Sequence, residues 1–280
     1  MIDLHAHTNQ SDGTLSPFEL IREASRVGLQ ALAITDHDTF AGYDEAIGYA
    51  RDAGIELVCG VELSTKYRGR SVHLLAYFLN HEPTLQFRRW VKSVEVSRNE
   101  RNQALARELR THGMQITLEE VTERAGRIVA RPHFAALMVE KGYVATIQSA
   151  FDLYLSESAS CFVSREEPDF HEAIAQILSS GGLPVLPHPG RFGIRPELLE
   201  EELAQMRILG LRGIEVYHSD HGAFEVESYS KLAVKLGMAV TGGSDFHGAA
   251  KAAVSLGSGI GGNVCVPNSI LDELRRIART

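Results

Sequence analysis

Short apolar segments along this chain end, one after another, in histidines or carboxylates. Apolar residues 31–35 are followed closely by His37, and residues 56–61 are followed directly by Glu62. Between them, residues 41–52 have the pattern of a helix. Alternating strands and helices are typical of parallel sheets with crossover helices, and barrels of this kind hold their sites at the carboxyl ends of the strands. The chain therefore predicts an α/β fold with a site at one end of its sheet.

The alternation continues in two separated parts of the chain. Further strands are predicted at residues 72–77, 183–186, 213–216 and 239–241. Between the two parts, residues 81–164 change to helical periodicity, which begins with a long helix at 85–112 and returns to a strand only at 161–164. We interpret residues 1–80 and 165–280 as a barrel and the stretch between them as an inserted helical cap over the site. A separate functional domain is the alternative, disfavoured because the barrel pattern resumes afterwards.

The bulk composition excludes some classes of protein. Hydrophobic residues make up 44% and charged residues 23%, as in a soluble globular protein. The net charge of −8 argues against a broad basic nucleic-acid surface, but not against a local anion site that holds cations. No apolar run suits a membrane span, and the N-terminus lacks a signal-peptide pattern. Cys59, Cys161 and Cys265 lack zinc spacing and predict reduced thiols in a cytoplasmic protein without membrane association.

Two histidines near the N-terminus, His5 and His7, are two residues apart on a predicted strand and therefore share one face. The complete set of candidate metal ligands is His5, His7, Asp12, His37, Glu62, His73, His188, Asp245 and His247. This set suits two or three divalent ions with bridging carboxylates better than one tetrahedral zinc. Nitrogen and oxygen ligands without thiolate favour manganese, with zinc or iron as alternatives. Alone, His73 in a strand or Asp12 beside a glycine is more often structural, but the shared position at strand ends favours metal binding.

The motifs at these positions resemble those of the PHP family, named for polymerases and histidinol phosphatases. They are His5-Ala6-His7, Asp36-His37, Gly60-Val61-Glu62, His188-Pro189 and Ser244-Asp245-Phe246-His247. The resemblance implies a distorted seven-stranded TIM-like barrel, a centre of two or three metal ions bound by all nine candidates, and phosphoester hydrolysis. Asp12 stands where many histidinol phosphatases of the family have a histidine, which argues against histidinol phosphate as the substrate.

The predicted insertion resembles a narrower subgroup of this family. Its motifs are Arg131-Pro132-His133-Phe134-Ala135, Gly142-Tyr143-Val144 and Ala150-Phe151-Asp152-Leu153-Tyr154-Leu155, accompanied by His188-Pro189-Gly190-Arg191. They are similar to those of 3′,5′-nucleoside bisphosphate phosphatases, whose members related to RNase AM also act as 5′-3′ exoribonucleases on short or 5′-phosphorylated RNA. The resemblance implies a small phosphorylated substrate, a nucleoside 3′,5′-bisphosphate, with short RNA as a second candidate. A histidinol phosphate phosphatase and a non-catalytic metal-binding PHP module are the alternatives.

Three residues are predicted to bind the substrate phosphate, namely Arg131, His133 and Arg191. Arg131 and His133 begin a predicted helix, where free amides also favour anions, and a guanidinium matches the geometry of phosphate. Arg191 closely follows a ligand motif. A surface ion pair is the alternative for each arginine, with Glu197 or Glu200 as the partner of Arg191.

Catalytic roles are predicted for His221, His247 and Asp245, with His221 or His247 protonating the leaving 3′-oxygen during metal-assisted attack on phosphorus. His218 follows the same predicted strand as His221. The long predicted helix carries Arg98, Arg101, Arg107 and Arg110. Because these arginines are interleaved with glutamates, we predict a solvated helix face with intrahelical pairs rather than a track for RNA.

Overall fold

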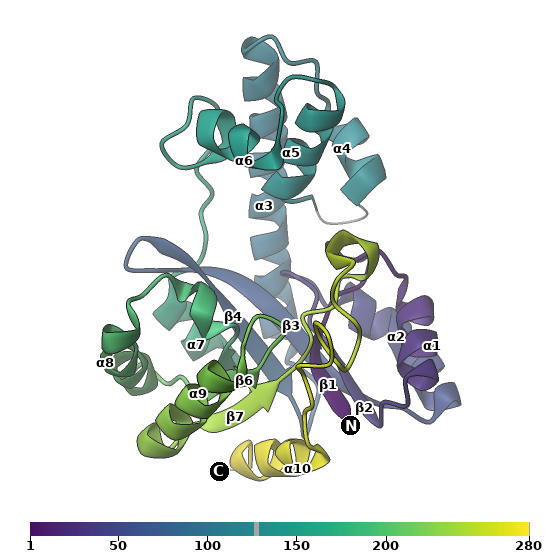
Figure 1. The fold of residues 1–280 in the computed structure, drawn as a ribbon, viewed down its shortest axis with the longest axis vertical. Coiled ribbons are helices and arrows are strands. Elements are labelled where there is room, and N and C mark those ends of the chain that lie inside the picture. The colour runs from purple at the N-terminus through teal and green to yellow at the C-terminus, as the bar shows by residue number, and fades with distance from the viewer. Residues whose placement is uncertain (126–128, 280) are drawn as a thin grey trace.

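In the computed structural model, residues 1–125 and 129–279 are described, and they form one curved sheet flanked by helices (Figure 1). The strands are β1 (Ile2–Ala6), β2 (Ala31–Ile34), β3 (Glu56–Tyr67), β4 (Arg70–Phe78), β5 (Leu183–Leu186), β6 (Gly213–Tyr217) and β7 (Ala239–Gly242). The flanking helices are α1 (Pro17–Arg26), α2 (Ala41–Ala53), α7 (Phe170–Ser179), α8 (Pro196–Ile208), α9 (Ala223–Leu236) and α10 (Asn268–Ile277). Short 3-10 turns, η2 (Pro189–Phe192) and η3 (Gly248–Lys251), follow β5 and β7. The α/β class is confirmed.

The described strands pair in sequence order, from β1 to β7, in a seven-stranded sheet. The pairs β1–β2, β2–β3, β5–β6 and β6–β7 are parallel, as predicted. The prediction of parallel strands is wrong for β4, which pairs antiparallel with both β3 and β5. The reason is local: β3 continues to Tyr67, past its predicted end, and the turn Arg68-Gly69 leads straight into β4. A two-residue turn joins antiparallel strands and leaves no room for a crossover helix.

Alternate residues of the strands face two buried layers. Leu32 and Ile34 of β2 pack in a core with α1, α2 and α7 to α9, whereas Ala31 and Ala33 pack in a second core that includes α10. Figure 1 shows α10 beneath the sheet, at the end where β1 begins. Because both faces of the sheet are covered, a polar site has room only where the strands end.

At the opposite end from α10, the two edges of the sheet meet. An isolated bridge pairs Ala6 of β1 with Phe246, which follows β7. The backbone N–H of His7 donates to Phe246 O at 2.9 Å, and the N–H of Asp245 donates to His5 O at 2.8 Å. These bonds bring candidate ligands from the two ends of the chain together.

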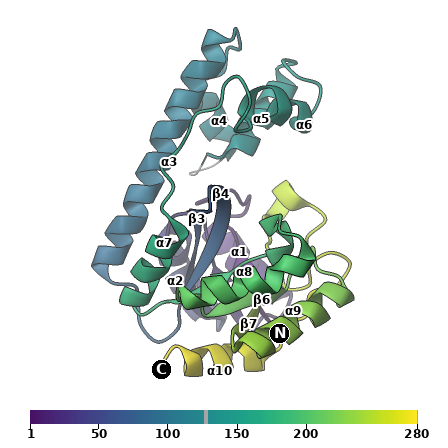
Figure 2. The same ribbon diagram turned by 90° about the vertical axis from the view of Figure 1, so that its left-hand side faces the viewer.

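Most of the segment between β4 and α7 stands apart from the sheet, on a stem formed by α3 (Figures 1 and 2). It contains α3 (Leu85–Thr111), α4 (Leu118–Ala125), α5 (Arg131–Glu140), α6 (Ile147–Ala150) and the π-helical turn η1 (Phe151–Leu155). Its own buried core includes Leu105, Phe134 and Met138. The strand predicted at 161–164 is absent, because Cys161 N and Phe162 N donate to carbonyls within the same segment. Among the described residues, no helix has the length and apolar character to cross a bilayer.

Candidate metal centre

The predicted ligands converge where β1, β2, β5 and β7 end. Among the described residues, three groups of side-chain donor atoms each lie within 4.8 Å of one another. The groups are His7, Asp12, His37 and His247; His5, His7, Glu62 and Asp245; and His37, Glu62 and His73. The groups interlock, because His7, His37 and Glu62 each belong to two of them. The remaining predicted ligand, His188, lies beside them with its Nε2 atom 2.9 Å from Glu62 Oε1.

Glu62 is the carboxylate at the centre of this arrangement. Its Oε2 atom lies near three imidazole nitrogens, at 3.2 Å from His5 Nε2, 3.1 Å from His7 Nε2 and 3.5 Å from His37 Nδ1. Its Oε1 atom lies 2.8 Å from His73 Nδ1. Burial opposes ionisation, but the imidazoles, His37 and His73 foremost, hold the pKa of Glu62 well below its usual range. An ionised, central carboxylate is the group expected to bridge cations.

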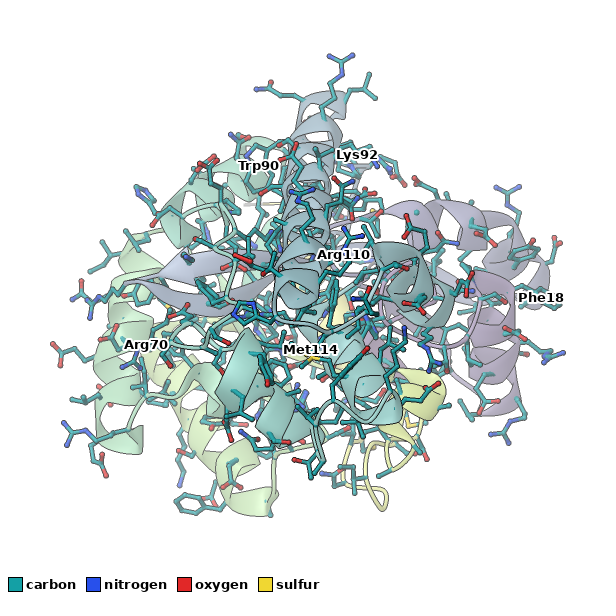
Figure 3. All side chains as sticks on the ribbon, turned by 90° about the horizontal axis from the view of Figure 1, so that it is seen from above. Phe18, Arg70, Trp90, Lys92, Arg110 and Met114 are labelled. Carbon is teal, nitrogen blue, oxygen red and sulfur yellow. The ribbon has the colours of Figure 1, made fainter. Side chains whose placement is uncertain are left out.

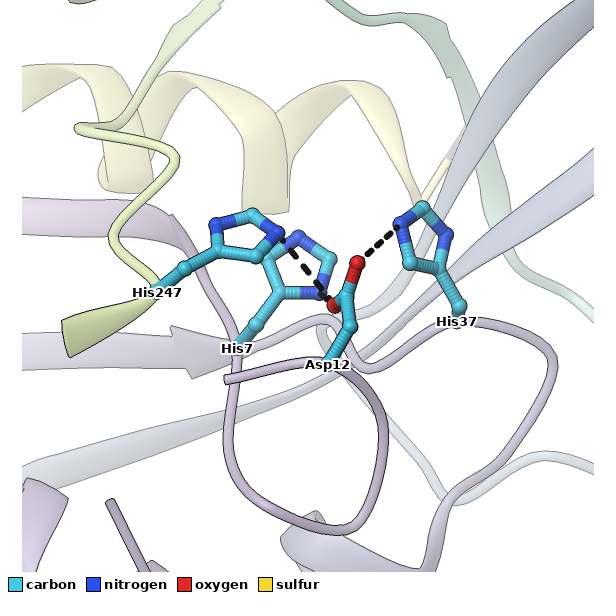
Figure 4. Close-up of side chains that lie close together, drawn as sticks. All are labelled: His7, Asp12, His37 and His247. Carbon is cyan, nitrogen blue, oxygen red and sulfur yellow. Dashed lines mark ion pairs between the residues drawn. The ribbon is translucent and has the colours of Figure 1, made fainter. Parts of the chain in front are cut away.

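Asp12 brings the loop after β1 into the centre (Figure 4). Its Oδ1 atom lies 3.2 Å from His247 Nε2, and its Oδ2 atom lies 3.6 Å from His37 Nε2. The loop is held by buried Asp36, which accepts hydrogen bonds from the backbone N–H and the hydroxyl of Thr8 at 2.8 and 2.6 Å. Asp12 therefore connects ligands that follow β2 and β7.

Two imidazoles have nitrogen atoms that suit a metal ion. His7 Nε2 and His37 Nδ1 are buried and form no hydrogen bond in the described part of the chain, although both face Glu62 Oε2 at 3.1 and 3.5 Å. Burial lowers the pKa of His7 to about 3 and that of His37 to about 4, so both rings are neutral near pH 7. Donor atoms about 2.1 Å from a shared ion lie about 3.0–3.5 Å apart. The donor set therefore fits divalent cations.

The two carboxylate oxygens of Asp245 contact different groups: one faces the predicted ligands, and the other accepts hydrogen bonds from basic side chains. Its Oδ1 atom lies 3.6 Å from His5 Nε2 and 3.5 Å from His7 Nε2. Its Oδ2 atom accepts hydrogen bonds from Arg191 Nη1 at 2.9 Å and from Lys251 Nζ at 2.6 Å. Sequence reasoning misses Lys251, because no motif marks a lysine that turns back towards a ligand six residues earlier.

Buried carboxylates behind the ligands are also missed by sequence reasoning. Glu215 on β6 lies 2.9 Å from His5 Nδ1 and accepts a hydrogen bond from His188 N at 2.7 Å. Asp3 accepts hydrogen bonds from Ser244 N at 2.9 Å and from Ser244 Oγ at 2.5 Å. An acidic residue inside an apolar strand is the signal that identifies such groups, because a carboxylate is rarely buried without partners.

Arg131 and His133, the predicted phosphate-binding residues of the helical segment, have different surroundings in the structure. Arg131 lines a pocket of about 280 Å³ together with the predicted ligands Asp12, His37 and His73. It forms no ion pair with any described residue, and its Nη1 donates to Leu155 O at 3.3 Å. His133 instead accepts a hydrogen bond from Ala130 N at 3.0 Å, so its Nδ1 atom serves the start of α5.

Arg191 lies on η2, three residues after the predicted ligand His188. Its guanidinium pairs with Asp220 at 2.5 Å and Asp245 at 2.9 Å rather than with the partners considered from sequence, Glu197 and Glu200. The side chain is 42% exposed and remains open to a substrate. Arg191 therefore forms an ion pair, although with other partners than those considered from the sequence, and its role in binding phosphate remains a prediction.

Of the two histidines that follow β6, His218 lies nearer the ligands. Its Nε2 atom is 3.3 Å from Asp245 Oδ2, and its Nδ1 atom accepts from Asp220 N at 3.0 Å. His221 Nδ1 lies 2.8 Å from Val216 O, and its buried Nε2 has no hydrogen-bond partner among the described residues. The structure therefore places His218 against the predicted ligand, whereas His221 lies outside the three ligand groups.

The prediction of a solvated arginine face on α3 is wrong for two of its four members. Arg98 and Arg101 are buried, at 6% and 8% exposure, whereas Arg107 and Arg110 are exposed. Figure 3 shows Arg110 near the end of α3 that points away from the sheet. The first half of α3 passes beside the sheet, where Arg98 donates to Asp38, and this long-range contact is invisible in the local charge pattern.

Comparison with known proteins gives matches over most of the chain. Residues 3–180 match the PHP domain. A 5′-3′ exoribonuclease of Haemophilus influenzae is 32% identical over 246 residues, which cover 88% of this chain and 89% of that protein. A 3′,5′-nucleoside bisphosphate phosphatase of Chromobacterium violaceum is 31% identical over 249 residues, which cover 88% and 87%.

Among solved structures, an amidohydrolase from Chromobacterium violaceum with bound sulfate and no metal has a TM-score of 0.83 and 29% identity. The alignment covers 98% of this chain and 96% of that one. This chain therefore belongs to the PHP domain family.

Proposed function

We propose that this chain is a metal-dependent phosphoesterase that hydrolyses the 3′-phosphate of nucleoside 3′,5′-bisphosphates. The observation that carries the proposal is a shared pocket of about 280 Å³, lined by the ligands Asp12, His37 and His73 and by the cation Arg131. One phosphate at the metal ligands and a second anionic group near Arg131 would suit this pocket. The relatives named as a bisphosphate phosphatase and an exoribonuclease support the same class of substrate. The products would be a nucleoside 5′-monophosphate and phosphate.

The proposed reaction is an in-line displacement at phosphorus. The oxygen of water forms a bond to phosphorus, the bond to the 3′-oxygen breaks, and the leaving oxygen takes up a proton. Two or three divalent ions, for which we expect manganese with zinc or iron as alternatives, would activate water and stabilise the phosphoryl charge when bound. Glu62 and Asp245 keep the imidazoles of the centre in place, and Arg131 orients the substrate.

The proton for the leaving oxygen has two proposed sources. His247 Nε2 lies among the ligand atoms, 3.2 Å from Asp12 Oδ1. His221 Nε2 is buried near Gly190, and His221 belongs to none of the three ligand groups found among the described residues. If His221 is the donor, its substitution slows the hydrolysis of adenosine 3′,5′-bisphosphate far more than that of p-nitrophenyl phosphate, because p-nitrophenol leaves without protonation. Comparing His221→Asn on the two substrates tests the choice.

We extend the proposal to short RNA with a 5′-phosphate. A second hollow of about 150 Å³ is lined by His73, His188 and Arg191, and it shares His73 with the larger pocket. An RNA whose first internucleotide linkage lies at the metal ligands would place its following nucleotides, on the 3′ side, in this hollow. In the same proposal, the sheet is a distorted (β/α)7 barrel, and residues 81–164 form a cap over its site.

Histidinol phosphate suits this pocket poorly. Its amino group is a cation, and Arg131 beside the metal ligands would repel it. The test is an assay of purified, manganese-loaded protein on adenosine 3′,5′-bisphosphate, histidinol phosphate and a 5′-phosphorylated oligoribonucleotide. We expect adenosine 5′-monophosphate and phosphate from the first substrate. Activity on histidinol phosphate alone would overturn the nucleotide proposal.

A further inference from the structure

The beginning of β4 has a free edge beside the turn that follows β5. From Leu75 to Tyr77 this strand pairs with β5, whereas before Leu75 it pairs with β3 alone among the described strands. Figures 1 and 2 show this end of β3 and β4 extending past the other strands towards the helical segment. The second hollow, of about 150 Å³, is lined by residues of this part of β4 and of η2.

A third hollow adjoins the second one and contains no predicted metal ligand. It has a volume of about 310 Å³, and Phe192 lines both hollows. The second hollow in turn shares Ser71 and His73 with the larger pocket beside the metal centre. The three therefore form a connected series that leads from the predicted ligands to the tip of the β3–β4 hairpin.

Positive charge dominates this third hollow, which we name the outer arginine hollow. Three guanidinium groups and one carboxylate line it, in a chain whose net charge is −8. Its charged and aromatic lining residues are Tyr67, Arg68, Arg70, Phe192, Arg195 and Glu202. The excess of positive charge favours an anionic partner at this place on an otherwise acidic protein.

The one carboxylate of the outer arginine hollow has both oxygens occupied. Glu202 Oε1 accepts a hydrogen bond from Arg68 Nη1 at 2.5 Å, and Glu202 Oε2 accepts from the hydroxyl of Tyr67 at 3.0 Å. Arg68 therefore balances the charge of Glu202, and the other two arginines remain without a carboxylate partner among the described residues.

These two arginines, Arg70 and Arg195, have unused donors. Arg70 Nη1 donates to Gly193 O at 3.2 Å. The side chain of Arg195 is exposed and forms no hydrogen bond or ion pair with any described residue. Guanidinium groups of this kind match the oxygens of phosphate groups in geometry and charge.

Two aromatic rings give the outer arginine hollow an apolar floor. The ring centres of Tyr67 and Phe192 lie 5.9 Å apart, and both side chains are largely buried. The guanidinium of Arg68 lies 5.2 Å from the ring centre of Tyr67. Cationic groups beside aromatic rings are the combination that binds single-stranded nucleic acid without reading its sequence.

We propose that the outer arginine hollow binds the 3′ part of a single-stranded RNA substrate, with Arg70 and Arg195 contacting phosphates beyond the hydrolysed linkage. The inference rests on the proposed function, because it places the first internucleotide linkage at the metal ligands. A strand is favoured over an acidic protein segment because the hollow is connected to that site through the second hollow. Contacts there increase the reactivity of strands long enough to reach them.

The first test compares the double variant R70Q/R195Q with the control R51Q/R107Q, which changes the net charge equally. Both control arginines are exposed, on α2 and α3, and their side chains form no hydrogen bond or ion pair with a described residue. The measured quantity is the ratio of kcat/KM for a 5′-phosphorylated pentaadenylate to kcat/KM for adenosine 3′,5′-bisphosphate. At low salt we expect the ratio to fall at least about 10-fold in R70Q/R195Q. It should stay within about 2-fold of the parent value in the control.

An unchanged ratio in a folded R70Q/R195Q protein overturns the inference and leaves the proposed function intact. A binding measurement covers the opposite case, in which no nucleotide is hydrolysed. Calorimetry with the pentaadenylate is performed on the full chain in chelator, between about 50 and 200 mM salt. Two phosphate contacts on a single strand predict that the slope of log K against log salt is shallower by about 1.4 in R70Q/R195Q.

Equal affinities and slopes in the parent protein and R70Q/R195Q, or no binding to the parent protein, overturn the inference. The expected difference in binding without any hydrolysis contradicts the proposed function alone. Size-exclusion chromatography of the same samples tests the other occupant. If the variant changes only the oligomeric state, the surface joins copies of this chain and the inference is overturned.

A second variant keeps the test decisive if R70Q/R195Q does not fold. Arg195→Glu changes one exposed side chain that forms no hydrogen bond or ion pair with a described residue. Its negative charge should repel the strand and lower both the kinetic ratio and the affinity for pentaadenylate at least about 10-fold at low salt. Parent-like values in R195E overturn the inference.

Discussion

Arg98 on α3 donates to Asp38 Oδ2 from both Nε, at 3.1 Å, and Nη2, at 2.5 Å. Asp38 is fully buried and directly follows His37, a predicted metal ligand. Its backbone has a φ of +54°, a conformation that is uncommon outside glycine, and Ser64 N donates to its Oδ1 at 2.8 Å. The stem of the helical segment is therefore attached to the residue that adjoins the metal centre.

Arg98→Met should destabilise the protein, because it leaves the buried Asp38 with Arg165 as its remaining cation. Removing one partner of a buried ion pair costs about 3 kcal/mol. The free energy of unfolding in urea measures the change. The control Arg107→Met, at an exposed position of α3, should change stability by less than about 0.5 kcal/mol. Equal losses in the two variants would contradict a structural role for the Arg98–Asp38 pair.

Divalent cations should stabilise the folded chain. Glu62 and Asp245 lie in one ligand group and Asp12 in a second group that shares His7 with it, so cations bound there relieve the repulsion of these carboxylates. At metal concentrations about 100-fold above Kd, stabilisation by about 2.7 kcal/mol is expected. Differential scanning fluorimetry in chelator and with added manganese measures the shift in Tm. The shift should be much smaller in Glu62→Gln, and a full shift in that variant would argue against Glu62 as a ligand.

Asp245→Asn should abolish turnover while leaving a folded protein. The substitution removes the charge that faces His5 and His7 and is held in place by Lys251. A loss of at least about 100-fold in kcat/KM for adenosine 3′,5′-bisphosphate is expected. Circular dichroism and metal content are measured on the same sample. A variant that changes only in stability would favour the non-catalytic PHP module instead.

The metal-free protein should lose stability in acid partly through Glu215. Burial opposes its charge, but His5 and His218 lower the pKa of Glu215 from 4.5 to about 2. Because the folded-state pKa is below the unfolded value, the stabilisation is fully present above about pH 4.5 and is lost as the pH falls towards 2. Its size is up to about 3 kcal/mol. Unfolding in chelator between pH 6 and 3 should show a shallower decline for Glu215→Gln, and parallel curves would rule out this contribution.

The positions of the strands and the set of candidate ligands could be predicted because their signals are local. The motif of His5 and His7 lies within a few residues of one strand, and a period of two places both rings on one face. Glu62 was also predicted as a ligand, and it lies in two of the three ligand groups although β3 continues past it to Tyr67. The ligand types were recognisable because histidines and carboxylates at successive strand ends have few purely structural explanations.

The sequence by itself determined the α/β class, the residue types of the candidate ligands and their order along the chain, since these depend on local periodicity and composition. Only the tertiary structure decided that β4 runs antiparallel, that Arg98 and Arg101 are buried, and that Glu215 supports the imidazole of His5. Burial and pairing depend on contacts between residues far apart in the chain. The interleaved charges of α3 are compatible with a solvated face, and only the packing of the folded chain buries Arg98 and Arg101 on one side of the helix.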